Sequence, residues 1–160
     1  MPLTIRQIRE GELDRVKQIT VEAFEPVSID KNIEREFGQI NGRDWGWRKA
    51  RHLDFDAERE WEGIFVAESD DELVGYITTW TDVEAGTGFI PNLAVIASRR
   101  GEGIGRKLIQ HALNHFRKLH LSHARIETLA QNQVGQSLYP SLGFVEVARQ
   151  VHYCMKLEAE

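Results

Sequence analysis

One stretch of the sequence reads Leu93-Ala94-Val95-Ile96-Ala97-Ser98-Arg99-Arg100-Gly101-Glu102-Gly103-Ile104-Gly105, an apolar run that leads into alternating glycines. The apolar run predicts a strand and the amphipathic pattern after it predicts a helix, so the glycines lie in the turn between them. Glycine has no Cβ, so the backbone there can turn tightly and direct N–H groups of the helix start at an anion. The stretch therefore indicates an anion-binding loop, with an ordinary glycine-rich turn as the alternative. Positive charge beside the loop comes from Arg99, Arg100, Arg106 and Lys107.

Two well-known phosphate-binding motifs do not fit these residues. A dinucleotide-binding G-x-G-x-x-G fingerprint that began at Gly101 would need glycine at Arg106, and one that began at Gly103 would need it at Leu108. A P-loop requires Gly-Lys-Ser/Thr, whereas Lys107 follows arginine and precedes leucine. The loop therefore belongs to neither class.

The pattern that fits is R-x-x-G-x-G, formed by Arg100, Gly103 and Gly105. It resembles the acetyl-CoA loop of the GCN5-related N-acetyltransferases. A second segment, from Asn132 to Phe144, is similar to the N-x-x-A-x-x-L-Y-x-x-L-G-F segment of that family. Two motifs in the order expected for the family make a chance resemblance improbable.

The chain departs from the family pattern at Ala97, where many members have proline, and at Gly135, where alanine is usual. Neither change removes a chemical group. The resemblance implies that pantetheine lies where strands 89–96 and 125–129 part, bound by main-chain groups of the first strand, and that N–H groups of residues 101–106 hold the pyrophosphate. The residues expected to bind acetyl-CoA are Leu93, Ala94, Val95, Arg100, Gly101, Glu102, Gly103, Ile104, Gly105, Arg106 and Asn132.

The resemblance also implies roles for particular side chains. Tyr139 stands where the family places its general acid, and a phenol of pKa ~10 is protonated at neutral pH; its alternative role is to pack the end of a short helix. Asn132 is expected to bind the cofactor arm or to hold that helix in place. Glu127 is the candidate general base, acting through water, and the alternatives are Glu84 and Asn92.

The chain has 160 residues, of which 41% are hydrophobic and 28% charged, with a net charge of −5. We expect one acetyltransferase domain over residues 1–160, as a monomer or homodimer. The acidic balance argues against a nucleic-acid partner, because phosphate neutralisation needs clustered Lys and Arg. No apolar run approaches the ~20 residues of a membrane span, and the N-terminus has no signal-peptide pattern, so we expect a cytoplasmic protein without a membrane partner.

The hydrophobic periodicity predicts α/β architecture, with a mixed, largely antiparallel central sheet flanked by helices, as in acyl-CoA N-acyltransferases. The helix between the strands at 89–96 and 125–129 makes these two strands parallel. The expected elements are a strand near 3–8, helices at 13–24, 30–40 and 44–61, strands at 64–68, 73–80 and 89–96, a helix from 104, a strand at 125–129, a helix at 132–142 and a hairpin of 144–148 and 151–157.

Other chemistry-bearing residues receive structural interpretations. The i, i+4 pair His111 and His115 lacks an H-E-x-x-H glutamate and a third ligand, so no metal is expected. The only cysteine, Cys154, is expected to be buried in a strand. The tryptophans Trp45, Trp47 and Trp61 are expected to pack, and a solvated acidic face is expected from Asp54, Asp56, Glu58, Glu60 and Glu62.

The sequence thus predicts an N-acetyltransferase that moves an acetyl group from acetyl-CoA to a primary amine of a small molecule or peptide, by direct transfer in a ternary complex. The alternative is a non-catalytic acyl-CoA sensor or an interaction domain on the same fold. The identity of the amine, and the use of acyl groups other than acetyl, are left open, because the expected pocket derives from residues 25–61.

Overall fold

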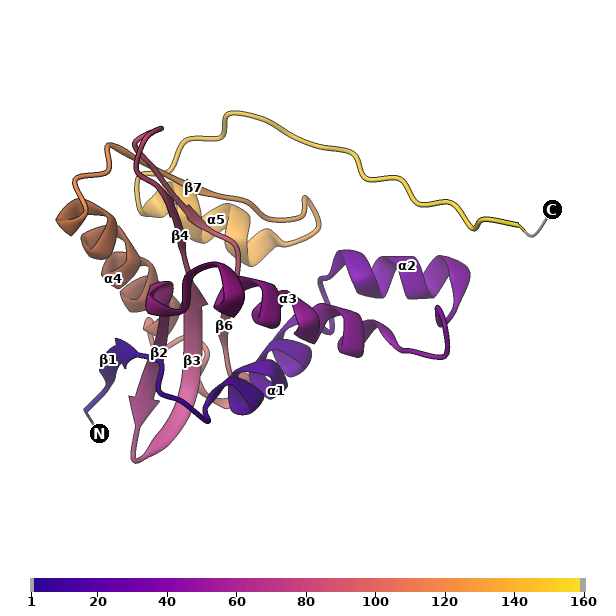
Figure 1. The fold of residues 1–160 in the computed structure, drawn as a ribbon, viewed down its shortest axis with the longest axis horizontal. Coiled ribbons are helices and arrows are strands. Elements are labelled where there is room, and N and C mark those ends of the chain that lie inside the picture. Colours follow the sequence, from indigo (N-terminus) through magenta and orange to yellow (C-terminus); the bar gives the residue numbers. More distant parts are fainter. Residues whose placement is uncertain (1, 159–160) are drawn as a thin grey trace.

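Two adjoining sheets form the centre of the molecule, with helices on both sides (Figure 1). The structure is a computed structural model and describes residues 2–158. The four-stranded sheet is antiparallel and has the order β1 (Thr4–Gln7), β2 (Ile64–Ser69), β3 (Glu72–Thr78) and β6 (Leu93–Val95). The three-stranded sheet has the order β4 (Trp80–Asp82), β5 (Thr87–Ile90) and β7 (His123–Ile126). β5 is antiparallel to β4 and parallel to β7, as the helical crossover predicts.

Each face of the sheets has its own hydrophobic core. One core includes Leu108, Ile109 and Phe116 of α4, and the other includes Val16 and Ile19 of α1 with residues of α3. The predicted mixed architecture is therefore confirmed. The helices are α1 (Leu13–Phe24), α2 (Ile29–Phe37), α3 (Trp45–Glu60), α4 (Ile104–Lys118) and α5 (Gln133–Ser141), with short 3-10 turns η1 (Trp61–Gly63) and η2 (Ala97–Arg99).

The predicted strand at 89–96 is interrupted at Pro91 and Asn92 and exchanges partners there. Before the break, β5 pairs with β4 and β7; after it, β6 pairs with β3. Proline has no N–H to give to a ladder, and the N–H of Asn92 donates to the Thr78 hydroxyl at 3.1 Å. β6 and β7 consequently part at this point.

A buried polar cluster holds the break. The Asp56 carboxylate on α3 accepts hydrogen bonds from Asn92 Nδ2 (2.7 Å), Thr78 Oγ1 (2.9 Å) and Trp80 Nε1 (3.2 Å). Lys49 Nζ donates to the Asn92 Oδ1 at 3.0 Å, and burial lowers the pKa of this lysine. Buried polar groups need such partners, because an unsatisfied one loses its hydration without compensation. The side chains therefore fix α3 against the point where the strands part.

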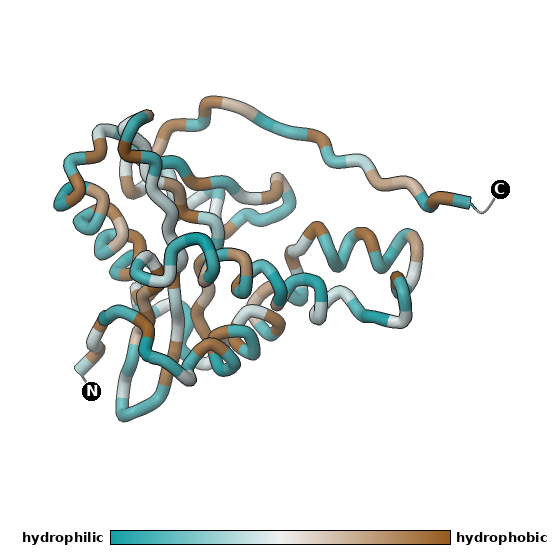
Figure 2. The backbone as a smooth tube through the Cα atoms, viewed as in Figure 1, coloured by the Kyte–Doolittle hydropathy of each residue, from teal (hydrophilic) through white to brown (hydrophobic). Residues whose placement is uncertain are grey.

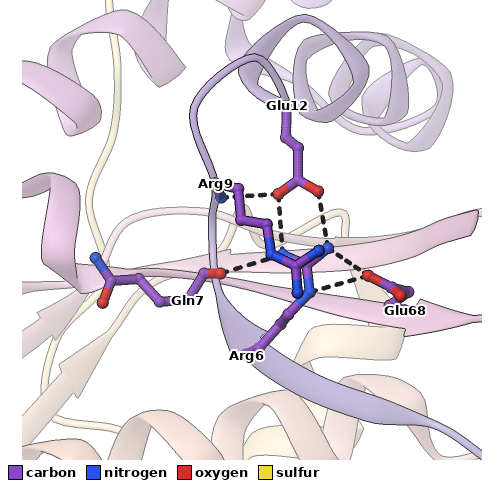
Figure 3. Close-up of polar contacts among 5 residues, drawn as sticks. All are labelled: Arg6, Gln7, Arg9, Glu12 and Glu68. Carbon is purple, nitrogen blue, oxygen red and sulfur yellow. Dashed lines mark hydrogen bonds and ion pairs between the residues drawn. The ribbon is translucent and has the colours of Figure 1, made fainter. Parts of the chain in front are cut away.

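A second polar cluster ties β1 to α1 and β2 (Figure 3). The Arg6 guanidinium donates to Glu12 at 2.7 and 3.0 Å and, through Nε, to Glu68 at 2.9 Å. Glu12 precedes α1 and also accepts from the N–H of Arg9 at 2.8 Å. The hydrogen bonds from Arg6 have the largest effect on the pKa of the Glu12 carboxyl and lower it, and the hydrogen bond from Arg9 lowers it further.

The predicted C-terminal hairpin is wrong. After Phe144 the chain runs extended and exposed, without a strand among the described residues up to 158, and leaves the body of the molecule (Figure 1). Cys154 is accordingly exposed, not buried. The alternating residues fit a strand, but they pair with no strand of the described residues.

The predicted solvated acidic face is wrong in part. Asp56 is 5% exposed in its cluster, and Glu60 Oε1 accepts from the Thr81 hydroxyl at 2.6 Å. Asp54 is half-buried and pairs with Lys17 Nζ at 2.6 Å. The remaining members, Glu58 and Glu62, are exposed as expected.

We expect Asp56→Ala to lower the free energy of unfolding by about 3–5 kcal/mol, because it leaves several buried donors without an acceptor and removes one of the two carboxylates near Lys49. Urea unfolding followed by circular dichroism measures the change. Glu58→Ala, on an exposed position of the same helix, is the matched control and should stay within about 0.5 kcal/mol. Equal effects of the two substitutions would contradict the role given to the cluster.

Candidate functional site

The first component of the site is the outer edge of β6. The β3–β6 ladder starts with a bond from Thr78 N–H to Asn92 O at 2.9 Å. Because an antiparallel ladder alternates, Ala94 turns its main-chain groups toward β3, while Leu93 and Val95 turn theirs to the opposite edge. No strand within residues 2–158 pairs with that edge. Leu93 and Val95 therefore offer free main-chain groups, and the expectation for Ala94 is not supported.

The second component is the glycine loop. Gly101 and Gly103 have φ of 83° and 78°, in the left-handed region that favours glycine. α4 starts at Ile104, whose side chain is buried in the core and anchors the helix start. The first bond of the helix runs from Lys107 N–H to the Gly103 O at 3.1 Å. Within the described part of the chain, the N–H groups of residues 101–106 have no acceptor.

The surroundings of the loop favour an anion. A Cβ built on Gly101 or Gly103 would meet no atom within 4 Å, so the space before the loop is open. Arg100 and Arg106 are exposed beside it. The carboxylate of Glu102 is paired with Arg99 Nε at 2.8 Å, which offsets its negative charge. A helix N-terminus with free N–H groups and added positive charge can hold a phosphate.

The third component is α5, which the structure places against the start of α4. A Cβ on Gly105 would lie 3.9 Å from Leu138 Cδ2. The Arg106 guanidinium donates to the Ser141 hydroxyl at 2.9 Å. The two motifs of the sequence, separated along the chain, thus meet at one end of the molecule.

Tyr139 lies within α5 and is half-buried. Its ring meets Phe144 edge-on, with centroids 6.2 Å apart. Burial raises the pKa of the phenol, because it disfavours the charged phenolate. Tyr139 therefore remains a proton donor at neutral pH, as a general acid requires.

Asn132 serves as the N-cap of α5. Its Oδ1 accepts from the N–H of Gly135 at 3.2 Å, and its Nδ2 donates to the Thr128 hydroxyl at 2.7 Å. A Cβ on Gly135 would lie 2.8 Å from Asn132 Nδ2 and 3.2 Å from a ring carbon of Tyr139. A side chain at position 135 would therefore clash with the Asn132 cap. Of the two roles expected for Asn132, the geometry supports the one that holds the helix in place.

The candidate bases occupy three different environments. Glu127 is exposed and follows β7, one residue past the last β5–β7 pair of Ile90 with Ile126, where the strands part. Glu84 lies in the β4–β5 turn, at the other end of β5, about 13 Å of strand away at ~3.3 Å per residue. Asn92 is 5% exposed and its amide is committed to Asp56 and Lys49. The geometry favours Glu127.

The sequence pattern missed the polar groups on the α2–α3 side of the site. Beyond the Asp56 cluster, Asn32 Nδ2 of α2 donates to Gln131 Oε1 at 3.1 Å and so joins α2 to the loop before α5. His52 of α3 is half-buried beside Asp30, with Nε2 and Oδ2 3.6 Å apart. Burial lowers the pKa of His52. The one available signal was the i, i+4 spacing of Asp30 and Glu34 and of His52 and Asp56, which did not identify their partners.

Residues 2–158 contain neither a group of side chains suited to a metal ion nor a helix suited to a membrane. In this range, histidine, cysteine and carboxylate side chains form no cluster of three or more suited to a metal ion. His111 and His115 instead meet the ring of Phe65 edge-on, at centroid distances of 4.5 and 5.1 Å. None of the helices in this range has the length and apolar character needed to traverse a bilayer.

Sequence comparison relates the chain to acetyltransferases. It is 34% identical to N-alpha-acetyltransferase 30 of Schizosaccharomyces pombe over 58% of this chain and 63% of that protein. It is also 34% identical to mycothiol acetyltransferase of Streptomyces avermitilis over 68% of this chain and 34% of that protein. The chain thus spans less than two thirds of the length of these relatives.

Structure comparison gives the same fold. The PaiA N-acetyltransferase from Thermoplasma acidophilum, solved in complex with coenzyme A, superposes with a TM-score of 0.71. The match covers 91% of each chain at 19% sequence identity. The model of the acetyltransferase (GNAT) family matches residues 26–144, a range that includes the β6 edge, the glycine loop and α5. The chain belongs to the GNAT acetyltransferase family.

Proposed function

We propose that the protein is an acetyl-CoA-dependent N-acetyltransferase that transfers an acetyl group directly to a primary amine in a ternary complex. The observation that carries the proposal is the junction of α4 and α5. There, the free N–H groups of residues 101–106 lie beside the helix that bears Tyr139, joined by the Arg106–Ser141 hydrogen bond. An anion site beside a helix that carries a half-buried proton donor suits a phosphate-bearing thioester substrate.

The residues of the chain fit acetyl-CoA in two ways. The N–H groups of 101–106 would hold its pyrophosphate, and the free main-chain groups of Leu93 and Val95 would bind its pantetheine as an added strand. The thioester supplies the activated acetyl group. One of the two strand N–H groups would stabilise negative charge on the reacting carbonyl oxygen.

Proton transfer completes the proposed mechanism. Tyr139 would give its proton to the departing thiolate, since burial keeps the phenol protonated. Glu127, at the point where the strands part, would accept the proton of the amine through water. An α-amino group, pKa ~8, needs less help to lose its proton than a lysine side chain, pKa ~10.4.

The relatives' names suggest the class of acceptor. One relative is an N-alpha-acetyltransferase and the other a mycothiol acetyltransferase, so a primary amine on a peptide or on a small molecule is the proposed substrate. A cytoplasmic location remains a prediction from the sequence.

A panel of amines tests the function. We expect the protein to release CoA from acetyl-CoA at pH 7 with at least one amine, and peptide α-amines to react faster than lysine side chains because of their lower pKa. Thiol detection of free CoA, with the acetylated amine identified by mass spectrometry, measures it. Tight binding of acetyl-CoA without turnover on any amine would instead indicate a non-catalytic sensor.

A charge placed in the first turn of α4 tests the anion site. Gly105 has ordinary helical conformation and room for a Cβ, so Gly105→Glu and Gly105→Gln differ in charge alone. We expect the glutamate variant to bind CoA at least about fivefold more weakly than the glutamine variant, because two like charges about 4 Å apart repel by ~1–4 kcal/mol. Isothermal titration calorimetry measures the affinities.

The melting temperature is the control for that pair. An acidic side chain at a helix N-terminus is favourable, so the glutamate variant should melt no lower than the glutamine variant. Equal CoA affinities for the two variants would show that the pyrophosphate does not bind at this loop.

Tyr139→Phe tests the general acid, because it deletes one hydroxyl and keeps the ring packed on α5. We expect kcat to fall by roughly 10²–10⁴-fold, with CoA affinity and melting temperature unchanged. Tyr153→Phe, at an exposed tyrosine of the C-terminal segment, is the matched control and should keep full kcat. If chemistry limits the rate and Tyr139→Phe still turns over at the wild-type rate, Tyr139 is only a packing residue.

A further inference from the structure

The segment of residues 145–157 combines a strand pattern with complete exposure. Its odd-numbered positions are apolar apart from Arg149, and its even-numbered positions are polar apart from Ala148 and Cys154, so hydrophobic residues recur along it between hydrophilic ones (Figure 2). Such a period of two is typical of a strand with one buried face. Yet the large apolar side chains are between 74% and 93% exposed, namely Val145, Val147, Val151, Tyr153, Met155 and Leu157. We call this segment the C-terminal arm.

The fold leaves one place that suits such a strand. β7 pairs with β5 on one side only, and no strand within residues 2–158 pairs with its other edge. Ala124 and Ile126 of β7 pack against the core of α4 but are only partly buried, as is Phe144 at the start of the arm. An open edge beside an incompletely covered core is a site for strand addition.

The backbone of the arm argues against a hairpin within the arm. A tight hairpin needs residues that readily adopt positive φ, usually Asn-Gly, Asp-Gly or a lone Gly. The residues midway along the arm are Ala148-Arg149-Gln150-Val151, and no residue from 144 to 158 has positive φ. The two halves of the arm form no pair with each other, and the arm extends away from the sheet (Figure 1).

We propose that the arm pairs with the free edge of β7 in a second copy of this chain, and that two copies exchange arms in a symmetric dimer. Each copy supplies both the strand and the edge, so a two-fold arrangement satisfies both at once. The apolar odd positions lie over Ala124 and Ile126 of the partner, and the even positions, Cys154 among them, share the face of His123 and Arg125. The added strand covers the core that packs against α5 of the partner.

Cysteine pairing tests which chain the arm joins. Cys154 is the only cysteine, so wild type carries a thiol on the arm alone, and Arg125→Cys/Cys154→Ala carries one on β7 alone. The two chains, made distinguishable by a tag, are refolded together and treated with a short bis-maleimide. We expect a covalent heterodimer, and the same with His123→Cys/Cys154→Ala. Glu10→Cys/Cys154→Ala, at an exposed position outside β7, is the control and should give none.

Oligomeric state gives an independent readout. We expect wild type to sediment as a dimer and Val151→Asp/Tyr153→Asp to sediment as a folded monomer, because the charges would enter the apolar face of the added strand. His152→Asp, on the opposite face of the arm, should remain a dimer. If the arm stayed in solvent, all three proteins would behave alike, since exposed substitutions change stability by only about 0.5 kcal/mol.

Three results would overturn the proposal. The first is a wild-type monomer. The second is an intramolecular cross-link in the single variant Arg125→Cys, which retains Cys154. That cross-link would show that the arm lies on the β7 of its own chain. The third is a dimer that the Val151→Asp/Tyr153→Asp chain still forms. Because CoA binding is measured separately, failure here would leave the proposed acetyl transfer unaffected.

Discussion

The hydrogen bond between Asp56 and Asn92 is the interaction on which the site depends. It joins α3 to the place where β5 ends and β6 begins, at 2.7 Å inside the protein. Pairing with β7 ends at Ile90, before this point, so the main-chain groups of Leu93 and Val95 stay free on the side away from β3. Burial of a carboxylate costs free energy unless several donors bind it. The donors around Asp56 therefore fix the position of its carboxylate. The site is thus shaped by a polar cluster to which the proposed mechanism assigns no chemical step.

Much of the fold could be predicted because its signals are local. The helix at 13–24 and the helix that starts at Ile104 follow from apolar periodicity, and both have the predicted starts. The glycine loop is equally local, since positive φ at Gly101 and Gly103 is a property of the residues themselves. The antiparallel pairing of β2 with β3 followed from the hairpin pattern, and the parallel pairing of β5 with β7 followed from the helical crossover rule. These features needed no knowledge of distant neighbours.

The errors all concern residues whose state is set by a partner far along the chain. Asp56 looks like any acidic residue of an exposed helix until Asn92 is placed beside it. The alternating residues of the C-terminal arm predict a strand, but a strand exists only with an edge to pair with. Local patterns specify what a segment can form, and tertiary contacts decide whether it does.

The close approach at Gly135 has a consequence for protein engineering. Replacing an unusual residue by the one common in its family is a widely used route to higher stability. Here alanine, the usual residue of the family pattern, would bring its methyl group within 2.8 Å of the Asn132 amide. A consensus substitution at this position would therefore disturb the cap of α5 unless Asn132 and Thr128 were redesigned with it. The three positions form a unit that has to be exchanged together.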